Sequence, residues 1–139
     1  MSLLLDTMIV SELRRAADRK ADPVFADWAA SASVETAFIS VITVHELERG
    51  ILLAQRKDAT KAGLYRQWLR VITATFDGRF LDVDYRVAQA AAALHVPDPA
   101  PFADALIAAT ALVHQLTIAT RNTSDFARFR LPLVNPWRP

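Results

Sequence analysis

Residues 102–125, FADALIAATALVHQLTIATRNTSD, decide the fold class of this chain, because one short stretch contains a helix, a strand and a polar segment. The nearly unbroken apolar run favours a buried helix over Phe102–His114, and LTIAT favours a short strand over Leu116–Thr120. Residues 120–125 then leave the strand with hydroxyl, amide and carboxyl side chains. A helix that leads directly into a short buried strand is typical of an α/β fold.

The same alternation of helix and strand continues towards both ends of the chain. Strands are predicted at Leu3–Leu5, Thr36–Ser40, Phe80–Asp84 and, at the edge, Leu131–Trp137. Helices are predicted from Thr7 to about Ala17, from Pro23 to about Ala32, from Thr43 to about Gln55, from Thr60 to about Phe76 and from Tyr85 to about Leu94. Short strands separated by helices predict a mostly parallel sheet of about five strands, covered on both faces.

Length and composition restrict the classes of protein that fit. A chain of 139 residues without repeats or linkers is expected to form a single domain, residues 1–139. Its 16 Lys and Arg balance 15 Asp and Glu, so no global field attracts nucleic acid. The absence of cysteine excludes disulfides, thiolate metal sites and cysteine nucleophiles. Apolar runs stay well short of the roughly 18 residues of a membrane span, so we expect a cytoplasmic protein with no membrane contact.

Four acidic side chains stand where a parallel sheet binds its ligands, beyond the carboxyl ends of the strands. Asp6 follows the first predicted strand, and Asp125 lies in the segment after residues 116–120. Glu46 and Asp104 lie inside apolar helical segments, where an unpaired buried charge is costly, and helical spacing directs both inward. Several carboxylates in a cysteine-free pocket are the oxygen ligands that Mg²⁺ or Mn²⁺ prefers.

Each of these acids also fits a purely structural role. Asp6 is placed to cap the helix that follows it, and Thr43 with Glu46 fits a capping box. Asp104 stands in the first turn of its helix, where negative charge is favourable, and Asp125 is placed to brace a loop. Because independent caps would not all gather at one end of a sheet, their joint placement favours a functional site.

Four motifs, in this order, resemble the PIN-domain nucleases. They are LLLDT (3–7), SVITVHELERG (40–50), ADALIAATALVHQLTIATRNTSDF (103–126) and NPW (135–137). Within that family the order and spacing are most similar to the toxin subunits called VapC and FitB. The resemblance implies a three-layer α/β/α PIN-like domain. It also implies a Mg²⁺- or Mn²⁺-dependent endoribonuclease that acts as the toxin of a VapBC-type toxin–antitoxin pair.

The resemblance assigns roles to particular residues. Asp6, Glu46 and Asp104 match the three invariant acids and are implied metal ligands. Asp6 and Asp104 would hold the principal ion, with Glu46 as a further ligand or as base to a water. The fourth acidic position is filled by Asp125 or by the neutral Asn122.

Other side chains are expected to support the acids and to hold RNA. Hydroxyl and amide groups predicted to orient carboxylates or water belong to Thr7, Ser40, Thr43, Thr120 and Asn122. Two groups of cations are placed to bind phosphates, although such runs are more often solvated helix faces. They are Arg14, Arg15, Arg19 and Lys20 in the first group and Arg56, Lys57, Lys61, Arg66 and Arg70 in the second.

The resemblance also implies partners. These are an RNA substrate, a VapB-like antitoxin, a second copy of the chain, and operator DNA reached only through the antitoxin. Apolar side chains on two predicted helices offer surfaces for the antitoxin, namely Ile9, Val10, Leu13, Leu52 and Leu53.

Two other functions fit the same sequence. Met8 stands where the family usually carries a small polar residue, and Asn122 replaces an acid of some relatives. These departures fit a catalytically weak PIN-fold assembly or binding subunit. A nuclease that matures RNA and is not a toxin is the other alternative.

Overall fold

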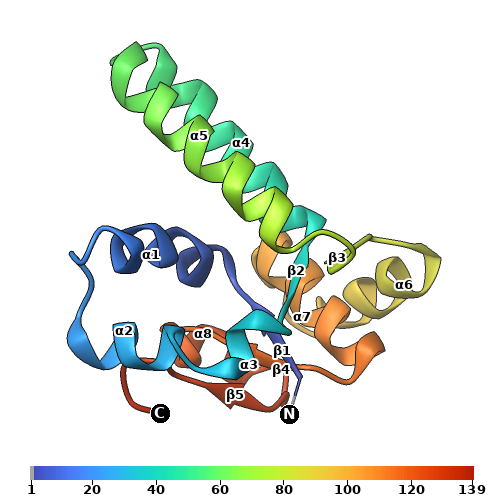
Figure 1. Ribbon diagram of the computed structural model, residues 1–139. Coiled ribbons are helices and arrows are strands. Elements are labelled where there is room, and N and C mark those ends of the chain that lie inside the picture. The colour runs from blue at the N-terminus through green and yellow to red at the C-terminus, as the bar shows by residue number, and fades with distance from the viewer. Residues whose placement is uncertain (1) are drawn as a thin grey trace.

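The predicted strands form one sheet in the computed structural model, which describes residues 2–139 except for the side chains at positions 32 and 33 (Figure 1). The strands are β1 (Leu3–Leu5), β2 (Phe38–Ser40), β3 (Phe80–Leu81), β4 (Thr117–Ala119) and β5 (Leu133–Val134). Their order is β3-β2-β1-β4-β5, and every neighbouring pair is parallel. The predicted α/β fold with a central parallel sheet is therefore confirmed.

Helices connect the strands and cover the sheet. They are α1 (Thr7–Ala17), α2 (Pro23–Ala29), α3 (Ala32–Glu35), α4 (Val41–Gln55), α5 (Ala59–Thr75), α6 (Tyr85–Ala93), α7 (Phe102–His114) and α8 (Thr123–Ala127). Aspartates at positions 6, 22, 58 and 84 cap four of them by accepting a backbone N–H of the first turn, as expected for N-cap residues. Within residues 2–139, no helix has the length and apolar character needed to cross a bilayer.

Several predicted boundaries differ from the structure. The helix expected from Pro23 to about Ala32 ends at Ala29 and is followed by the separate short helix α3. Helix α4 begins at Val41, two residues before the predicted Thr43, because the Ser40 hydroxyl accepts the Ile42 N–H at 3.0 Å and caps the helix. Helix α8 was not predicted. The strands β2 to β5 are shorter than predicted, since only their central residues pair with a neighbour.

The central strand β1 is buried on both faces. Its side chains alternate, so Leu3 and Leu5 join a cluster with Ile9 of α1 and Phe25 of α2, whereas Leu4 joins a cluster with α7 and α8 on the other face. Helix α6 packs against the outer side of α7. This burial on both faces is typical of a central strand of a parallel sheet.

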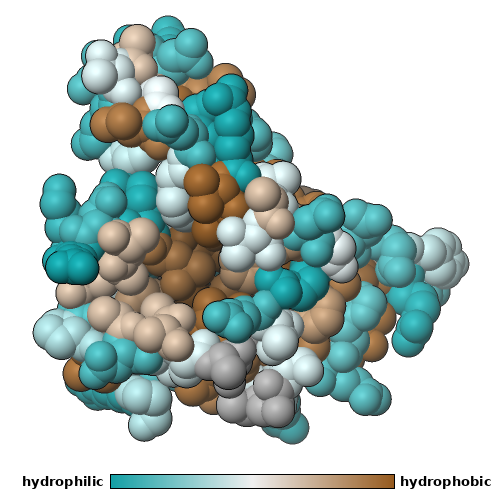
Figure 2. Space-filling view, viewed as in Figure 1, coloured by the Kyte–Doolittle hydropathy of each residue, from teal (hydrophilic) through white to brown (hydrophobic). Residues whose placement is uncertain are grey.

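Helices α4 and α5 form a hairpin that projects from the body (Figure 1). The buried side chains Ile51, Leu69, Ile72 and Phe76 anchor it in the core on the α1 side of the sheet. Figure 2 shows that apolar side chains gather in a hollow between the hairpin and the layer below it. Because α4 starts directly after β2, its first turns lie at the carboxyl end of the sheet.

The turn after α5 requires a glycine. Gly78 has φ +80°, a conformation that costs a residue with a side chain about 1–2 kcal/mol. We expect Gly78→Ala to lower the free energy of unfolding in urea by about 1 kcal/mol. Gly63→Ala is the matched control in the exposed part of α5, where an added Cβ meets no atom within 4 Å. It should raise that free energy by about 0.5–1 kcal/mol, and a common sign for the two changes would contradict the argument.

Candidate active site

The site lies beside the central strand β1, from which the chain adds strands first on one side and then on the other. The central strand β1 has β2 on one side and β4 on the other, so the crevice beyond their carboxyl ends is the switch point of this sheet. Asp6 follows β1 and Thr120 follows β4. The two segments are joined because the Asp6 N–H donates to the Ala119 carbonyl at 3.2 Å. The residues that leave both strands are thereby held side by side.

One cavity of about 400 Å³ at this point contains all four predicted acids. They come from the cap of α1, from α4, from α7 and from α8. The residues that line it are Asp6, Thr7, Met8, Ser11, Glu46, Asp104, Ile107, Asn122, Asp125 and Phe126. The structure thus brings together residues that lie up to 119 positions apart, and the neutral alternative Asn122 lines the same cavity as Asp125.

Asp6 is the buried member of the set, at 5% exposure. Its Oδ1 accepts the Ile9 N–H at 2.9 Å, so the structural role of capping α1 is present together with the place in the cavity. Burial raises the pKa of Asp6 above its ordinary value, although hydrogen bonds from Thr120 and Ile9 lower it; the charges of Asp104 and Glu46 add to the rise. The carboxylate is therefore held in a place where its charge is unfavourable.

Asp104 experiences the same electrostatic conflict. Burial raises its pKa, and the negative charges of Asp125 and Glu46 raise it further. The ion pairs found among residues 2–139 join Arg15 to Glu12 and Arg66 to Glu48, and so leave the four acids of the cavity without a cation. A pocket of mutually repelling carboxylates is a place where a positive ion would bind favourably.

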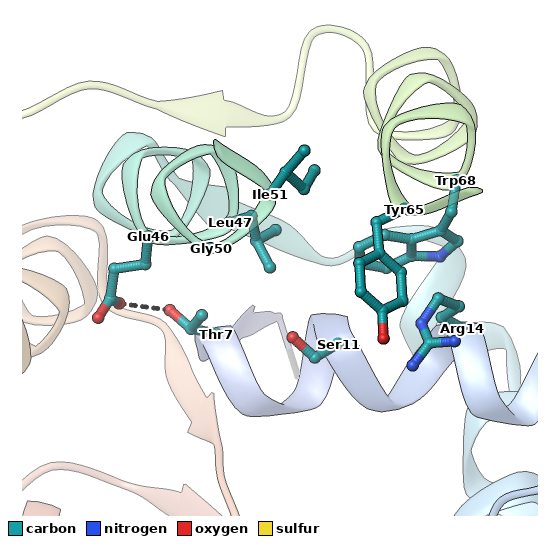
Figure 3. A pocket seen from close by; sticks show the side chains of 9 residues that line it. All are labelled: Thr7, Ser11, Arg14, Glu46, Leu47, Gly50, Ile51, Tyr65 and Trp68. Atoms are coloured by element: carbon teal, nitrogen blue, oxygen red, sulfur yellow. Dashed lines mark hydrogen bonds between the residues drawn. The ribbon is translucent and has the colours of Figure 1, made fainter. Parts of the chain in front are cut away.

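Glu46 is oriented by a threonine from the neighbouring helix. The Thr7 hydroxyl donates to Glu46 Oε1 at 2.6 Å (Figure 3). The same hydroxyl lies 3.0 Å from the Thr43 hydroxyl. The capping box proposed for Thr43 and Glu46 is wrong, because Ser40 caps α4 and Thr43 is buried inside the helix. Glu46 is consequently available to the cavity, and the Thr7 hydroxyl, which lies beside that of Thr43, binds one of its oxygens.

The remaining predicted supports divide into two groups. Thr120 hydrogen-bonds the Asp6 carboxyl and accepts the Asn122 N–H at 3.0 Å, so it links the two segments that leave the sheet. Ser40 instead caps α4 and is absent from the residues lining the cavity. Ser11, which lines the cavity one helical turn after Thr7, was not predicted from the sequence. That spacing of four residues was the signal that could have identified it.

The chemistry of the donors suits a divalent cation. Carboxylate oxygens are the ligands of Mg²⁺ and Mn²⁺, and neighbouring carboxylates of the cavity raise the pKa of Asp6 and of Asp104. In the described part of the chain, however, no three His, Cys, Asp or Glu side chains converge closely enough to form a ready-made metal centre. The residues fit the ion by charge and donor type, and their side chains would have to close around it.

Residues outside the cavity bear on two questions, the predicted antitoxin surface and the role of histidine. Ile9 and Val10 are fully buried and cannot offer a surface to an antitoxin, whereas Leu52 and Leu53 are more than half exposed. None of the described histidines lines the acidic cavity, and the Nδ1 of His95 accepts the Ala100 N–H at 3.0 Å. Histidine therefore has no part in the acidic site.

With a parallel sheet and four acids at its switch point, the chain belongs to the PIN domain family, which matches residues 3–131. Within that family it is similar along its whole length to proteins of the VapC and FitB type. Toxin FitB of Neisseria gonorrhoeae is 36% identical over 97% of this chain and 98% of its own length. VapC ribonuclease Y4jK of Sinorhizobium fredii is 32% identical over 99% of both chains. Plasmid stability protein StbB of Pseudomonas syringae pv. tomato is 36% identical over 97% of this chain and 98% of its own.

Solved structures agree in fold. A chain in the crystal structure of FitAcB from Neisseria gonorrhoeae superposes with a TM-score of 0.86 at 33% identity, and the match covers 99% of each chain. A chain in the structure of FitAB bound to an IR36 DNA fragment superposes with a TM-score of 0.84 at 32% identity, over 99% of this chain and 96% of the other. The fold and the family thus have independent support along nearly the whole chain.

The repulsion among the acids makes a prediction about stability. Because the pKa of Asp104 is raised in the folded protein, its ionisation opposes folding, and this loss develops as the pH rises through the raised pKa. We expect Asp104→Asn in EDTA to be more stable than the natural chain at pH 7 and equal to it below the ordinary value of 3.8. Urea unfolding across this pH range measures the difference. Exposed Asp77→Asn is the control, and a destabilised Asp104→Asn protein at pH 7 would contradict the prediction.

Proposed function

We propose that the chain is a Mg²⁺- or Mn²⁺-dependent endoribonuclease that acts as the toxin of a VapBC-type pair. The observation that carries the proposal is the single cavity into which four helices or helix caps bring Asp6, Glu46, Asp104 and Asp125. The names of the relatives support it, since one is called a VapC ribonuclease and another a toxin. RNA is the proposed substrate, and the cytoplasm is the proposed place of action.

Asp6 and Asp104 are the proposed ligands of the principal ion, with Glu46 as a further ligand or as the base. When bound, a divalent cation supplies Lewis-acid polarisation of a phosphate and lowers the pKa of water. The Thr7 hydroxyl engages one oxygen of Glu46 and thereby fixes the direction of the other. This restraint matters because a base must be held at the proton that it accepts.

For the fourth acidic position we propose Asp125 in preference to Asn122. The negative charge of Asp125 raises the pKa of Asp104, and both carboxyls line the same cavity. Asn122 stands at the N-cap of α8, and its backbone N–H is engaged by Thr120. Its neutral amide adds no charge to the site.

The proposed reaction is hydrolysis of a phosphodiester bond. The oxygen of a water forms a bond to phosphorus while the bond from phosphorus to the 3′ oxygen breaks, which leaves a 5′-phosphate and a 3′-hydroxyl. Glu46 is the proposed acceptor of the proton that the water loses, and the departing 3′ oxygen takes a proton from solvent. The buried Asp6 hydrogen-bonds the α1 backbone and so gives the site a fixed reference point.

Removal of the central acids tests the proposal. Purified protein should cut single-stranded RNA with Mg²⁺ or Mn²⁺, and EDTA should abolish the cleavage. Glu46→Gln should lower kcat by about 100-fold or more, since general acid–base groups contribute this much, and Asp104→Asn should do the same. Asp125→Asn should reduce cleavage more than Asn122→Ala. Cleavage that survives in EDTA would exclude the metal-dependent mechanism.

The contact between Thr7 and Glu46 gives a separate prediction. Thr7→Val keeps the shape of the side chain but removes the hydroxyl that donates to Glu46. We expect kcat to fall roughly 10- to 100-fold, the usual effect of losing a partner of a ligand. Thr7→Ser retains the hydroxyl and should keep most of the activity. Equal rates for the two variants would show that the hydrogen bond does not position Glu46.

The proposed partners follow from the same relatives. We propose a VapB-like antitoxin, a homodimer of this chain within a toxin–antitoxin assembly, and contact with operator DNA only through the antitoxin. The structure of FitAB bound to an IR36 DNA fragment supports binding of such an assembly to DNA. The near balance of 16 basic and 15 acidic residues gives this chain no general attraction to DNA.

The assembly-subunit alternative keeps one observation in its favour. Met8 is 40% exposed and lines the acidic cavity with an apolar side chain in place of a polar one. A chain with this role would neither cut RNA nor gain thermal stability from Mn²⁺. Thermal unfolding with and without Mn²⁺, performed beside the cleavage assay, separates this alternative from the nuclease.

A further inference from the structure

A second hollow continues from the acidic cavity into a groove between three helices (Figure 3). Each helix presents one face to it, with residues spaced three or four apart. The lining residues of α1 are Thr7, Ser11 and Arg14, and those of α5 are Tyr65 and Trp68. Thr7, Ser11 and Glu46 line both hollows, so the groove of about 340 Å³ opens directly onto the acids.

The groove carries a positive charge at the end away from the acids. The Arg14 guanidinium lies over the Tyr65 ring, 4.6 Å from its centroid, and Figure 3 shows both at the opposite end from Glu46. Neither of the ion pairs found among residues 2–139 includes Arg14. Arg14 lies seven positions after Thr7 in α1, a distance of about 10 Å along the helix axis. The groove therefore offers a cation at the end that lies away from the acids.

Gly50 keeps this groove open. It lies inside α4, where glycine is less favourable than alanine, and it lines the groove. A Cβ at this position would meet no atom within 4 Å, so packing within the chain does not require glycine here. A side chain at position 50 would instead extend into the space between α4 and the other two helices.

We propose that this groove binds the nucleotide of single-stranded RNA next to the phosphodiester bond that is cut. The inference rests on the proposed function, because it takes the acids as the place of cleavage. The apolar wall of Leu47, Ile51 and Trp68 accepts the base, and Arg14 binds the neighbouring phosphate. The combination of an aromatic or apolar surface with a cation is what single-stranded nucleic acid requires. These residues then determine which bases stand beside the cut.

Binding of RNA can be measured apart from cleavage. In the Asp104→Asn background, fluorescence anisotropy with a labelled single-stranded RNA reports affinity without turnover. Gly50→Phe should weaken binding roughly tenfold, the order of one lost base contact, whereas Gly50→Ala should leave it unchanged. Thermal unfolding of both variants shows whether the fold is kept.

Arg14 supplies a second pair of variants that does not depend on Gly50. Arg14→Ala should weaken binding and reduce the slope of log K against log salt by about 0.7, the value for one phosphate contact of a single strand. Arg15→Ala is the matched control, because Arg15 is paired with Glu12 at 3.5 Å and is absent from the groove. Equal slopes for the two variants would overturn the proposal.

Cleavage of a randomised RNA pool, with sequencing of the new 5′ ends, tests the effect on specificity. The chain with Gly50→Phe should cut with a higher KM and an altered preference beside the cut, while Gly50→Ala cuts as the natural chain does. If the natural chain cuts nothing, the proposed function fails, but the binding experiment still judges the groove. Unchanged affinity and cut sites for Gly50→Phe would overturn the inference. A Gly50→Phe protein that no longer binds the antitoxin but still binds RNA would also overturn it, because the groove would then hold a protein.

Discussion

The repulsion among four carboxylates at one end of the sheet is the constraint on which the rest of this structure depends. Burial and neighbouring charge raise the pKa of both Asp6 and Asp104, so the acids oppose the folding that brings them together. The arrangement persists because Asp6 follows a strand that is buried on both faces and cannot move without disrupting the core. The stability of the central sheet thus offsets an unfavourable charge distribution, as is common where a site serves binding or catalysis.

Asp6 combines a structural role with a place in the candidate site. One oxygen accepts the Ile9 N–H and begins α1, and the same carboxyl lines the cavity. Helix α1 in turn places Thr7 against Glu46 and extends one face along the groove to Arg14. The cap therefore orients the helix that supports both the acids and the adjoining groove. From its sequence position Asp6 could be a helix cap or a member of the acidic site. In the folded chain the same carboxyl caps α1 and lines the acidic cavity.

The sequence predicted the elements with strong patterns and missed those whose definition depends on distant contacts. Helices α1 and α7 have the predicted limits, because α1 begins after a capping aspartate and α7 is a long apolar run that begins after a proline. The start of α4 was misplaced, since Ser40 and Thr43 are both good caps and only the end of β2 decides between them. Periodicity identified Ile9 and Val10 as an apolar face, but it could not tell that Phe25 and the sheet already cover that face.

The candidate site, too, was predicted from the sequence only in part. The acids were found from the sequence because a carboxylate after a strand or within an apolar helix is conspicuous on its own. The pairing of Thr7 with Glu46 joins residues 39 positions apart, and nothing in either segment alone indicates it. The groove is less visible still, because Gly50, Arg14 and Trp68 are unremarkable until three helices face one another. The groove depends on packing between helices, whereas each acid of the cavity stands out within its own segment, so only the acids leave a local signal in the sequence.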